Sequence, residues 1–515
     1  MKAPRACWQC RQSKRKCSSR GPCEPCVPCQ RRHLQCGLEP AGARYGTSHR
    51  PAENSLSSKL EQAGQLESVG SDDQDLAPHL AIHLVELYLE EIHDRTQSIF
   101  HAATLRVKVK HDDISSALLY AICALGSKFW ADPERRDLEP RLTEAAKRFL
   151  QADLENICVE NIQTCIILAN LSAGNGQTQS QALYLRIASS MAEILHLDSP
   201  HPDAPIIERE ISRKIWWSLY FADRLCFSGL GLRCRVEDVD DQSSNITWKP
   251  GIWAQLVKLG RHLVPIQDLN RRIATGVKDT SKVDLEMENL KHELEAWSRQ
   301  LPPEMQMSIQ NLIRQEQNGI GGAFVTLHLT YHHFSTLLYF RFLEGRQCSS
   351  ADGSGYIALC KHHASSFSSL LHLSRQIKGC RANCPTIAHM TAVSSSVLVH
   401  SLLFGGPEDL HTARQELKTN FEALIDLQYY WPATEAMINR LMAFQSLCLL
   451  STESHKLDGW MVRYLLEHSL ALEERNLPIK TSNADMESES MISKTRDLQK
   501  TGRYTDLQSL ADKNG

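Results

Sequence analysis

The chain has 515 residues, 42% hydrophobic and 23% charged, which is enough for two to four domains and a large core. Its net charge of −3 is unevenly spread, because residues 1–50 hold eleven Lys or Arg against two Glu, or +9, leaving −12 for the rest. This asymmetry indicates an anionic polymer such as nucleic acid as a partner, and without an apolar run of 18 residues or a secretory signal we expect a soluble protein rather than a membrane or secreted one.

The first predicted element is a cysteine motif that occurs twice. The spacing Cys-x-x-Cys-x6-Cys runs from Cys7 to Cys17 and again from Cys26 to Cys36. Two tetrahedral zinc ions need eight ligand positions, so six thiolates can serve both only if two sulfurs are shared. The repeat therefore predicts one binuclear zinc cluster held by Cys7, Cys10, Cys17, Cys26, Cys29 and Cys36. Cations suited to phosphate stand beside it: Arg11, Lys14, Arg15, Lys16 and Arg31.

A seventh cysteine, Cys23, leaves two other arrangements open. It could form the second Cys-x-x-Cys pair with Cys26, with Cys36 closing that site. Alternatively, seven cysteines and His33 supply eight ligands, enough for two separate zinc ions. We favour the shared cluster because it alone uses the repeated spacing in full.

Residues 41–79, which follow this head (residues 1–40), are rich in Gly, Pro, Ser, Gln and acidic residues and lack a sustained periodicity. This composition predicts a flexible linker. Within it, Leu56, Leu60 and Leu66 could share one helix face and form a short dimerisation helix. That segment is shorter than the three or four heptads of a stable coiled coil, so the flexible spacer is the favoured interpretation.

From residue 80 onward the apolar residues recur with helical spacing, and strand-like alternation is nearly absent. We predict a mainly α fold class, with one large all-helical domain, the body, over residues 80–475 and a disordered tail over residues 476–515. Helix breaks are expected at 173–178, 199–205 and 301–303. Two examples of helical stripes are Ile82, Val85, Leu89 and Ile92, and Val283, Met287, Leu290, Leu294 and Trp297.

Several side chains of the body could have either a functional or a structural role. His328 and His332 have the i, i+4 spacing of some metal sites, but Leu329 stands where a metalloprotease needs its Glu, so we interpret them as core histidines. Trp216 and Trp217 are expected to be core anchors. Asp223 and Arg224 could form a surface or a buried ion pair, and Gly229–Gly231 and Gly319–Gly322 are predicted turns. Ten scattered cysteines are expected to be reduced core thiols: 123, 158, 165, 226, 234, 348, 360, 380, 384 and 448.

The head resembles the fungal zinc binuclear cluster DNA-binding domain in its cysteine spacing, in the eight residues between the halves and in the basic stretch before Cys17. Residues 80–240 independently resemble the fungal transcription-factor middle domain. The matching segments read AxxMAxxLHL at 188–197 and EREISRKIWWSLYFADR at 208–224. The body beyond residue 240 is similar only in its helical character.

The resemblance implies a nuclear, sequence-specific transcription factor, an activator of RNA polymerase II genes, and not an enzyme. Its small zinc-folded DNA-binding module would carry two zinc ions, bridged by Cys7 and Cys26, and would read CGG-type triplets in double-stranded DNA. Lys14 holds the position of the family's base-reading lysine, and a phosphate contact is its alternative role. The positioning contacts to phosphate would come from Arg11, Arg15, Lys16 and Arg31.

The resemblance also implies partners for the helical regulatory domain. These are the transcription machinery, a second copy of the chain in a homodimer, and a small-molecule effector, but no membrane. The sequence leaves open whether the body holds a ligand pocket or only a packed core. The alternative function is that of a zinc-dependent enzyme or an RNA-binding protein. The body lacks a recognisable group of acid and base residues of the kind that an enzyme would need. The head lacks the aromatic residues that stack on RNA bases, since Trp8 is the only Trp, Tyr or Phe before Cys36.

Overall fold

The structure is a computed structural model of the chain. It describes residues 27, 76–95, 97–131, 138–227, 233–234, 236, 251–276, 280–344, 352–450, 458–467, 495–507 and 509. The chain divides into two compact units, Met1–Asp75 and Leu76–Gly515, and the described residues lie almost entirely in the second.

The second unit is helical, as predicted, and no strand occurs in the ranges just given. Its N-terminal bundle comprises α4 (Pro78–Glu91), α5 (Ala102–Lys110), α6 (Ser116–Ser127), α7 (Leu138–Ala152), α8 (Val159–Gly174), α9 (Thr178–Ile194) and α10 (Ile206–Ala222), which continues into the π-helical turn η3 (Asp223–Phe227). The C-terminal bundle comprises α11 (Ile252–Gly260), α12 (Leu263–Ala274), α13 (Thr280–Gln300), α14 (Ile309–Gln317), α15 (Gly321–Tyr339), α16 (Asp352–Gln376), α17 (Pro385–Phe404), α18 (Leu410–Tyr430), α19 (Thr434–Leu450) and α20 (Gly459–Leu466), with short turns η4 (Pro303–Met305) and η5 (Phe340–Glu344).

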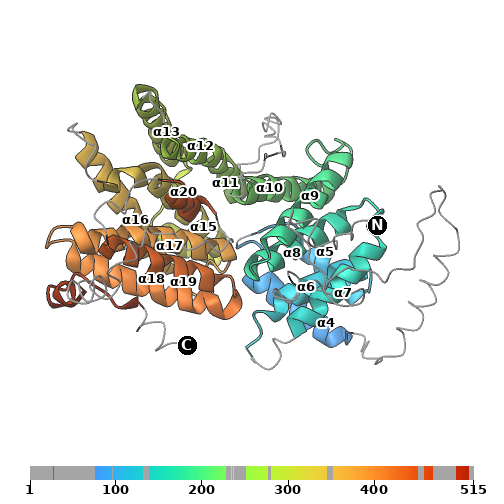
Figure 1. Ribbon diagram of the computed structural model, residues 1–515. Helices are drawn as coiled ribbons and strands as arrows, with labels where there is room; N and C mark the ends of the chain where they lie inside the picture. The colour runs from blue at the N-terminus through green and yellow to red at the C-terminus, as the bar shows by residue number, and fades with distance from the viewer. Residues whose placement is uncertain are drawn as a thin grey trace, which may run out of the picture. The chain divides into compact units, whose positions relative to one another are not determined.

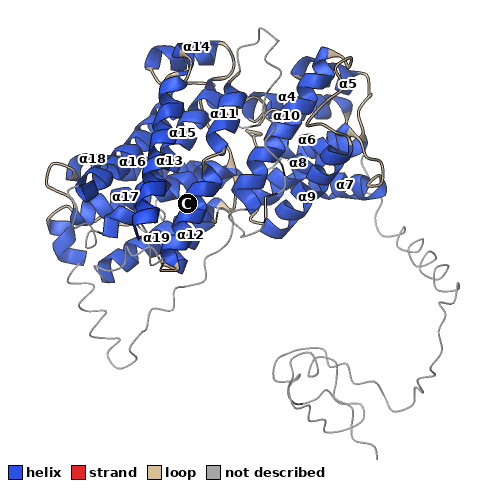
Figure 2. Ribbon diagram, turned by 90° about the horizontal axis from the view of Figure 1, so that it is seen from above, coloured by secondary structure: helices blue, strands red, loops and turns tan. Residues whose placement is uncertain are grey.

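The two bundles lie side by side in both views, and α10 and α11 run across their junction (Figures 1 and 2). Their buried apolar side chains form a single cluster that extends from Ala81 to Leu507. The bundles are therefore parts of one hydrophobic core, and they share a seam.

The predicted helical stripes can be compared with this core. On α13 all five predicted residues are buried, from Val283 to Trp297. On α4, Val85, Leu89 and Ile92 are buried, but Ile82 is 44% exposed, since the buried face of α4 is centred on its neighbours Ala81, Leu84, Val85 and Tyr88. The predicted breaks also coincide with helix ends, at Gly174, Ile194 and Gln300.

Local signals explain where several helices begin and end. The hydroxyls of Ser115 and Ser308 accept hydrogen bonds from the backbone N–H groups of Leu118 and Asn311, at 3.4 and 3.1 Å, and so cap α6 and α14. Gly319, with φ +76°, follows α14 in the left-handed conformation, so a turn occurs at the start of the predicted segment, but Gly321 and Gly322 begin α15. The other predicted turn, Gly229–Gly231, lies outside the described residues.

Helix α17 is the central core helix of the C-terminal bundle. It is long and apolar enough to cross a membrane, with a mean hydropathy of 1.5 over an 18-residue window, yet 83% of that window is buried inside the protein. A helix that is apolar all round is expected in such a position. Its small polar groups are bonded internally, because the Asn420 amide donates to the hydroxyls of Ser368 and Ser395.

The C-terminal segment differs in part from the predicted disordered tail. Leu507 is only 1% exposed, and Gln445 of α19 donates to the carbonyl of Thr505 at 2.8 Å. The guanidinium of Arg503 donates to the carbonyls of Leu402 and Gly405 at the end of α17. Residues 495–507 therefore pack on the C-terminal bundle, through one apolar anchor and polar contacts that carry no sequence periodicity.

The nine described cysteines of the body are free, as expected for reduced thiols, and six of them are buried. Burial raises the pKa of Cys123 and of Cys165 to about 12. These thiols are therefore protonated and unreactive at neutral pH. Cys348 lies outside the described residues.

A pair of helix glycines tests how tightly the seam is packed. A Cβ at Gly174 would lie 2.1 Å from a ring carbon of Trp431, whereas a Cβ at Gly355 would meet nothing within 4 Å. We expect Gly174→Ala to lower the free energy of unfolding by about 1–3 kcal/mol through overpacking. Gly355→Ala, the matched control in α16, should leave it unchanged or raise it by up to ~1 kcal/mol. Equal effects of the two changes in urea unfolding would contradict the packing described here.

Candidate functional site

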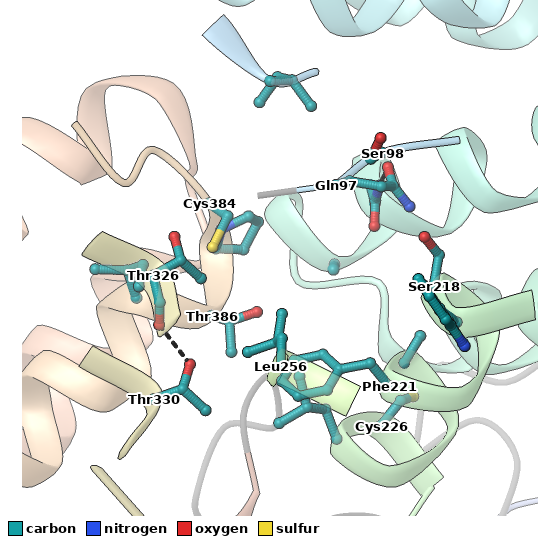
Figure 3. Close-up of a pocket in the computed structure, with 18 of the residues that line it drawn as sticks. Gln97, Ser98, Ser218, Phe221, Cys226, Leu256, Thr326, Thr330, Cys384 and Thr386 are labelled. Atoms are coloured by element: carbon teal, nitrogen blue, oxygen red, sulfur yellow. Dashed lines mark hydrogen bonds between the residues drawn. The ribbon is translucent and has the colours of Figure 1, made fainter. Parts of the chain in front are cut away.

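A cavity of about 150 Å³ lies at the seam between the two bundles. Its wall on the N-terminal side comes from α8, α9, α10 and η3, and its wall on the C-terminal side comes from α11, α15 and α17. Figure 3 shows Ser98 and Ser218 on one side, Thr326 and Cys384 on the other, and Leu256 between them. Junctions between helical units are frequent places for small-molecule sites.

Helix α10 contributes one whole face to this cavity. Six of the lining residues that it and η3 supply stand at i, i+3, i+4, i+7, i+8 and i+11, which is one stripe of an α-helix, and Cys226 of η3 lines the cavity beside them. The stripe is polar at Lys214 and Ser218 and apolar at its other positions, Trp217, Phe221, Ala222 and Leu225. Both Trp216 and Trp217 were predicted from the sequence to be core anchors, but only Trp216 is buried in the core, whereas Trp217 is half-buried and lines the cavity.

Apolar groups make up most of the remaining wall. Trp253, Leu256 and Val257 of α11 are part of it, as are Ile387 and Met390 of α17. Trp431, which follows α18, also lines the cavity and is 1% exposed. Such a wall favours a ligand with a flat or compact apolar body.

Two of the three threonine hydroxyls on the C-terminal wall are already bonded within the protein. The hydroxyl of Thr326 donates to the carbonyl of Gly322 at 2.9 Å, and that of Thr330 donates to the carbonyl of Thr326 at 2.7 Å (Figure 3). These hydroxyls therefore have little hydrogen-bonding capacity left for a ligand.

The polar groups on the wall formed by α9 and α10 are different. The Ser218 hydroxyl and the Gln181 side-chain amide make no hydrogen bond to any residue that the structure describes. The ammonium of Lys214 lies 3.6 Å from a carboxylate oxygen of Glu210, a long contact, and its side chain is 18% exposed. The hydrogen-bonding capacity of the cavity is therefore concentrated on this wall.

The end of α10 is fixed by a buried carboxylate. Asp223 is 1% exposed and accepts hydrogen bonds from the guanidinium of Arg186 and the backbone N–H of Val236, at 3.4 and 3.2 Å. The guanidinium of Arg224 lies over the ring of Tyr220, 3.3 Å from its centroid, and donates to the carbonyl of Val236. The acidic member of the predicted Asp223–Arg224 pair is thus buried and pairs with Arg186.

The residues predicted to bind zinc and DNA lie outside the described residues. They are Cys7, Cys10, Cys17, Cys26, Cys29, Cys36, Arg11, Lys14, Arg15, Lys16 and Arg31. Their assignment stays a prediction from the sequence.

The histidines of α15 belong to the core of the C-terminal bundle. The Nε2–H of His328 donates to the carbonyl of Met305 at 2.9 Å, and His332 and His363 contact each other through their Nδ1 atoms at 3.0 Å. His333 is 2% exposed and packs edge-to-face on His389. Within the described ranges, no group of three or more His, Cys, Asp or Glu side chains could hold a metal ion.

Comparison with known proteins bears on the unit that contains the cavity. Residues 85–247 match the family described as fungal specific transcription factor domain. The chain carries a fungal specific transcription factor domain. This range includes α10 and η3, and hence the polar wall of the cavity, and it agrees with the family that the segments 188–197 and 208–224 indicated.

The proteins to which this chain is similar in sequence have names that describe regulators of transcription. An uncharacterized transcriptional regulatory protein of Schizosaccharomyces pombe is 23% identical over 385 residues, covering 67% of this chain and 60% of that protein. The Zn(2)-C6 fungal-type transcription factors FTF1c and FTF2 of Fusarium oxysporum f. sp. lycopersici are each 20% identical, over 76% and 70% of this chain and 48% and 39% of their own lengths. The chain thus spans between about two fifths and three fifths of the length of these relatives.

The buried histidines of α15 and α16 make stability depend on pH. Burial lowers the pKa of His328 and of His363 to about 4, so the folded protein resists protonation that the unfolded chain accepts near pH 6.5. The unfolded state therefore binds more protons between these values, and stability present above pH 6.5 is lost as the pH falls toward 4. We expect a loss of roughly 1.4 kcal/mol per pH unit for each such histidine.

Urea unfolding of His328→Gln between pH 7 and pH 4.5 measures this effect. The variant should show a shallower dependence of unfolding free energy on pH than the parent. His372→Gln removes an exposed histidine and is the control. If both variants keep the parent's slope, the buried ring is not the source of the acid sensitivity.

Proposed function

We propose that the protein is a nuclear, sequence-specific transcription factor that binds double-stranded DNA through its head and receives a regulatory signal through its helical body. The observation that carries the proposal is the occurrence, in one chain and in this order, of the duplicated six-cysteine motif and of a fungal specific transcription factor domain at 85–247. The names of the relatives, which include Zn(2)-C6 transcription factors, support the same assignment.

The charge distribution supports DNA as the ligand of the head. Residues 1–50, with a net charge of +9, are attracted to a polyanion, whereas residues 51–515, with a net charge of −12, are not. In this proposal two zinc ions share the six thiolates, Lys14 contacts guanine in a CGG-type triplet, and Arg11, Arg15, Lys16 and Arg31 contact phosphates. The protein would act as an activator of RNA polymerase II genes through contacts with the transcription machinery, either alone or as a homodimer.

The body has a regulatory role in this proposal and is not an enzyme. The names of the relatives describe regulators of transcription, which supports that assignment. The cavity at the seam is the place we propose for a small-molecule effector, because both bundles contribute to its wall. A ligand bound there could bias the arrangement of the bundles.

Zinc content tests the proposed cluster. The full chain should contain two zinc ions by elemental analysis and lose DNA binding on chelation, because a segment of about 40 residues has too little core to fold alone. Cys29→Ser should abolish DNA binding, and Cys23→Ser, which leaves the repeated spacing intact, should retain it. One zinc ion per chain, or the opposite behaviour of the two variants, would favour one of the alternative ligand sets.

Substitution of Lys14 tests the proposed base contact. Lys14→Ala should weaken binding to the preferred duplex by roughly 1–3 kcal/mol and relax discrimination at one guanine. Arg15→Ala and Arg31→Ala should instead weaken binding to all duplexes alike and reduce its salt dependence. Titration of each variant against a CGG-containing duplex and a scrambled one separates the two roles. If Lys14→Ala behaves like the two arginine variants, Lys14 is a phosphate contact.

A further inference from the structure

We propose that the cavity at the seam binds a small aromatic monocarboxylate, with the carboxylate against Lys214, Ser218 and Gln181 and the ring against the apolar wall. The statement that this ligand is an effector rests on the proposed regulatory function. The binding site itself rests on the geometry of the cavity.

The size of the cavity limits the ligand. A volume of about 150 Å³ equals that of an engineered protein cavity which binds benzene. One six-membered ring fills most of it, and a carboxylate at the edge of the ring would reach the polar wall.

The apolar wall fits the ring of such a ligand. Trp217 and Phe221 of α10 are half-buried, and they line the cavity together with Trp253 and Leu256 of α11. Aromatic side chains attract another ring through edge-to-face or offset-stacked contacts, beyond the gain from burying apolar surface. A flat ring is therefore a better occupant than a sugar or a short polar chain.

The polar wall supplies hydrogen-bond donors, of which, within the described part of the chain, only Lys214 has a partner, the long contact with Glu210. The Lys214 ammonium, the Ser218 hydroxyl and the NH₂ group of Gln181 can all donate a hydrogen bond into the cavity. The indole N–H of Trp431, another lining residue, is buried and has no partner among the described residues. A buried donor without a partner costs free energy, so an acceptor-rich group is the complement of this wall. A carboxylate has two oxygens that accept hydrogen bonds and donates none.

The charge of the cavity wall favours a ligand with a negative charge. Lys214 is the single charged residue among the described lining residues, and no carboxylate lines the cavity in that set. A cationic ligand would place its charge beside the Lys214 ammonium with no carboxylate among the described lining residues to offset it, which is unfavourable. An anion gains a charge-assisted hydrogen bond from Lys214, whose contact with Glu210 is 3.6 Å long.

Calorimetric titration of the full chain with three probes of nearly equal shape tests the proposal. Benzoate should bind at one site per chain, benzamide should bind at least about tenfold more weakly because it lacks the charge, and benzylamine should not bind measurably. Equal affinities for benzoate and benzamide, or tighter binding of benzylamine, would overturn the carboxylate assignment. No binding of benzoate at millimolar concentration would overturn the site.

Lys214→Met is the decisive variant. Removing one charge-assisted hydrogen bond should weaken benzoate binding roughly 10- to 100-fold and leave benzamide binding within about twofold. Lys418→Met is the matched control, because Lys418 of α18 pairs with Glu422 at i, i+4 just as Lys214 pairs with Glu210, but it does not line the cavity. An equal effect of the two variants would show that benzoate binds elsewhere.

A second variant locates the ring without changing charge. Ala222 lines the cavity, and Ala222→Leu should fill part of it and weaken binding of benzoate and benzamide together. Thermal unfolding of each variant without ligand reports whether the fold is kept, and Lys214→Met keeps the test valid if Ala222→Leu unfolds. These titrations contain no DNA, so a failure of the ligand site and a failure of the proposed DNA binding are separate results.

Discussion

The contact between Trp431 and Gly174 is the joint on which the described unit depends. Trp431 belongs to the C-terminal bundle, yet its ring lies against the end of α8 in the N-terminal bundle, where only a glycine leaves room. The N–H of Ala433 donates to the carbonyl of Gly174 at 2.9 Å beside it. The same ring has the Lys128 ammonium 5.4 Å from its centroid and the ring of Phe129 at 5.9 Å. One side chain thus closes the shared core and forms part of the cavity wall.

This joint explains why the cavity exists where it does. Close packing leaves few voids within a bundle, since neighbouring helices fit ridges into grooves along their length. At the seam, helices of the two bundles meet, with α10 against α11, and they do not run side by side along their length as the helices within each bundle do. The aromatic groups of α10 and Trp431 fill most of the gap and leave a space the size of one ring.

Features of the fold that depend on nearby residues could be predicted from the sequence, whereas features that depend on residues far along the chain could not. The all-helical body, its breaks and the buried stripe of α13 follow from periodicity and from Gly and Pro positions, which act within one or two turns. The exposure of Ile82, the docking of Leu507 and the placement of Trp431 on Gly174 depend on partners far along the chain. The spacing i, i+3, i+4, i+7 from Lys214 to Leu225 could have shown that these residues share one helix face. Whether that face packs in the core or lines a cavity depends on α11 and α17, which the spacing does not describe. The residues assigned to zinc and DNA rest on motif spacing alone.

The small size of the cavity sets how a ligand there would regulate the protein. An effector can shift an equilibrium only by the difference between its affinities for the two states. A ligand of about nine non-hydrogen atoms has a ceiling of roughly 1.5 kcal/mol per atom and in practice much less, so a differential of a few kcal/mol is the most it would supply. That is enough to change a population ratio about 10- to 100-fold, and not enough to break a tightly joined seam. A ligand of this size could therefore regulate the protein only if two arrangements of the bundles lay close in free energy without it. The glycine at 174 permits the joint, while the buried indole N–H of Trp431, which has no partner among the described residues, costs free energy in the empty state. Accepting a hydrogen bond from that donor is the step through which a carboxylate of this size would act.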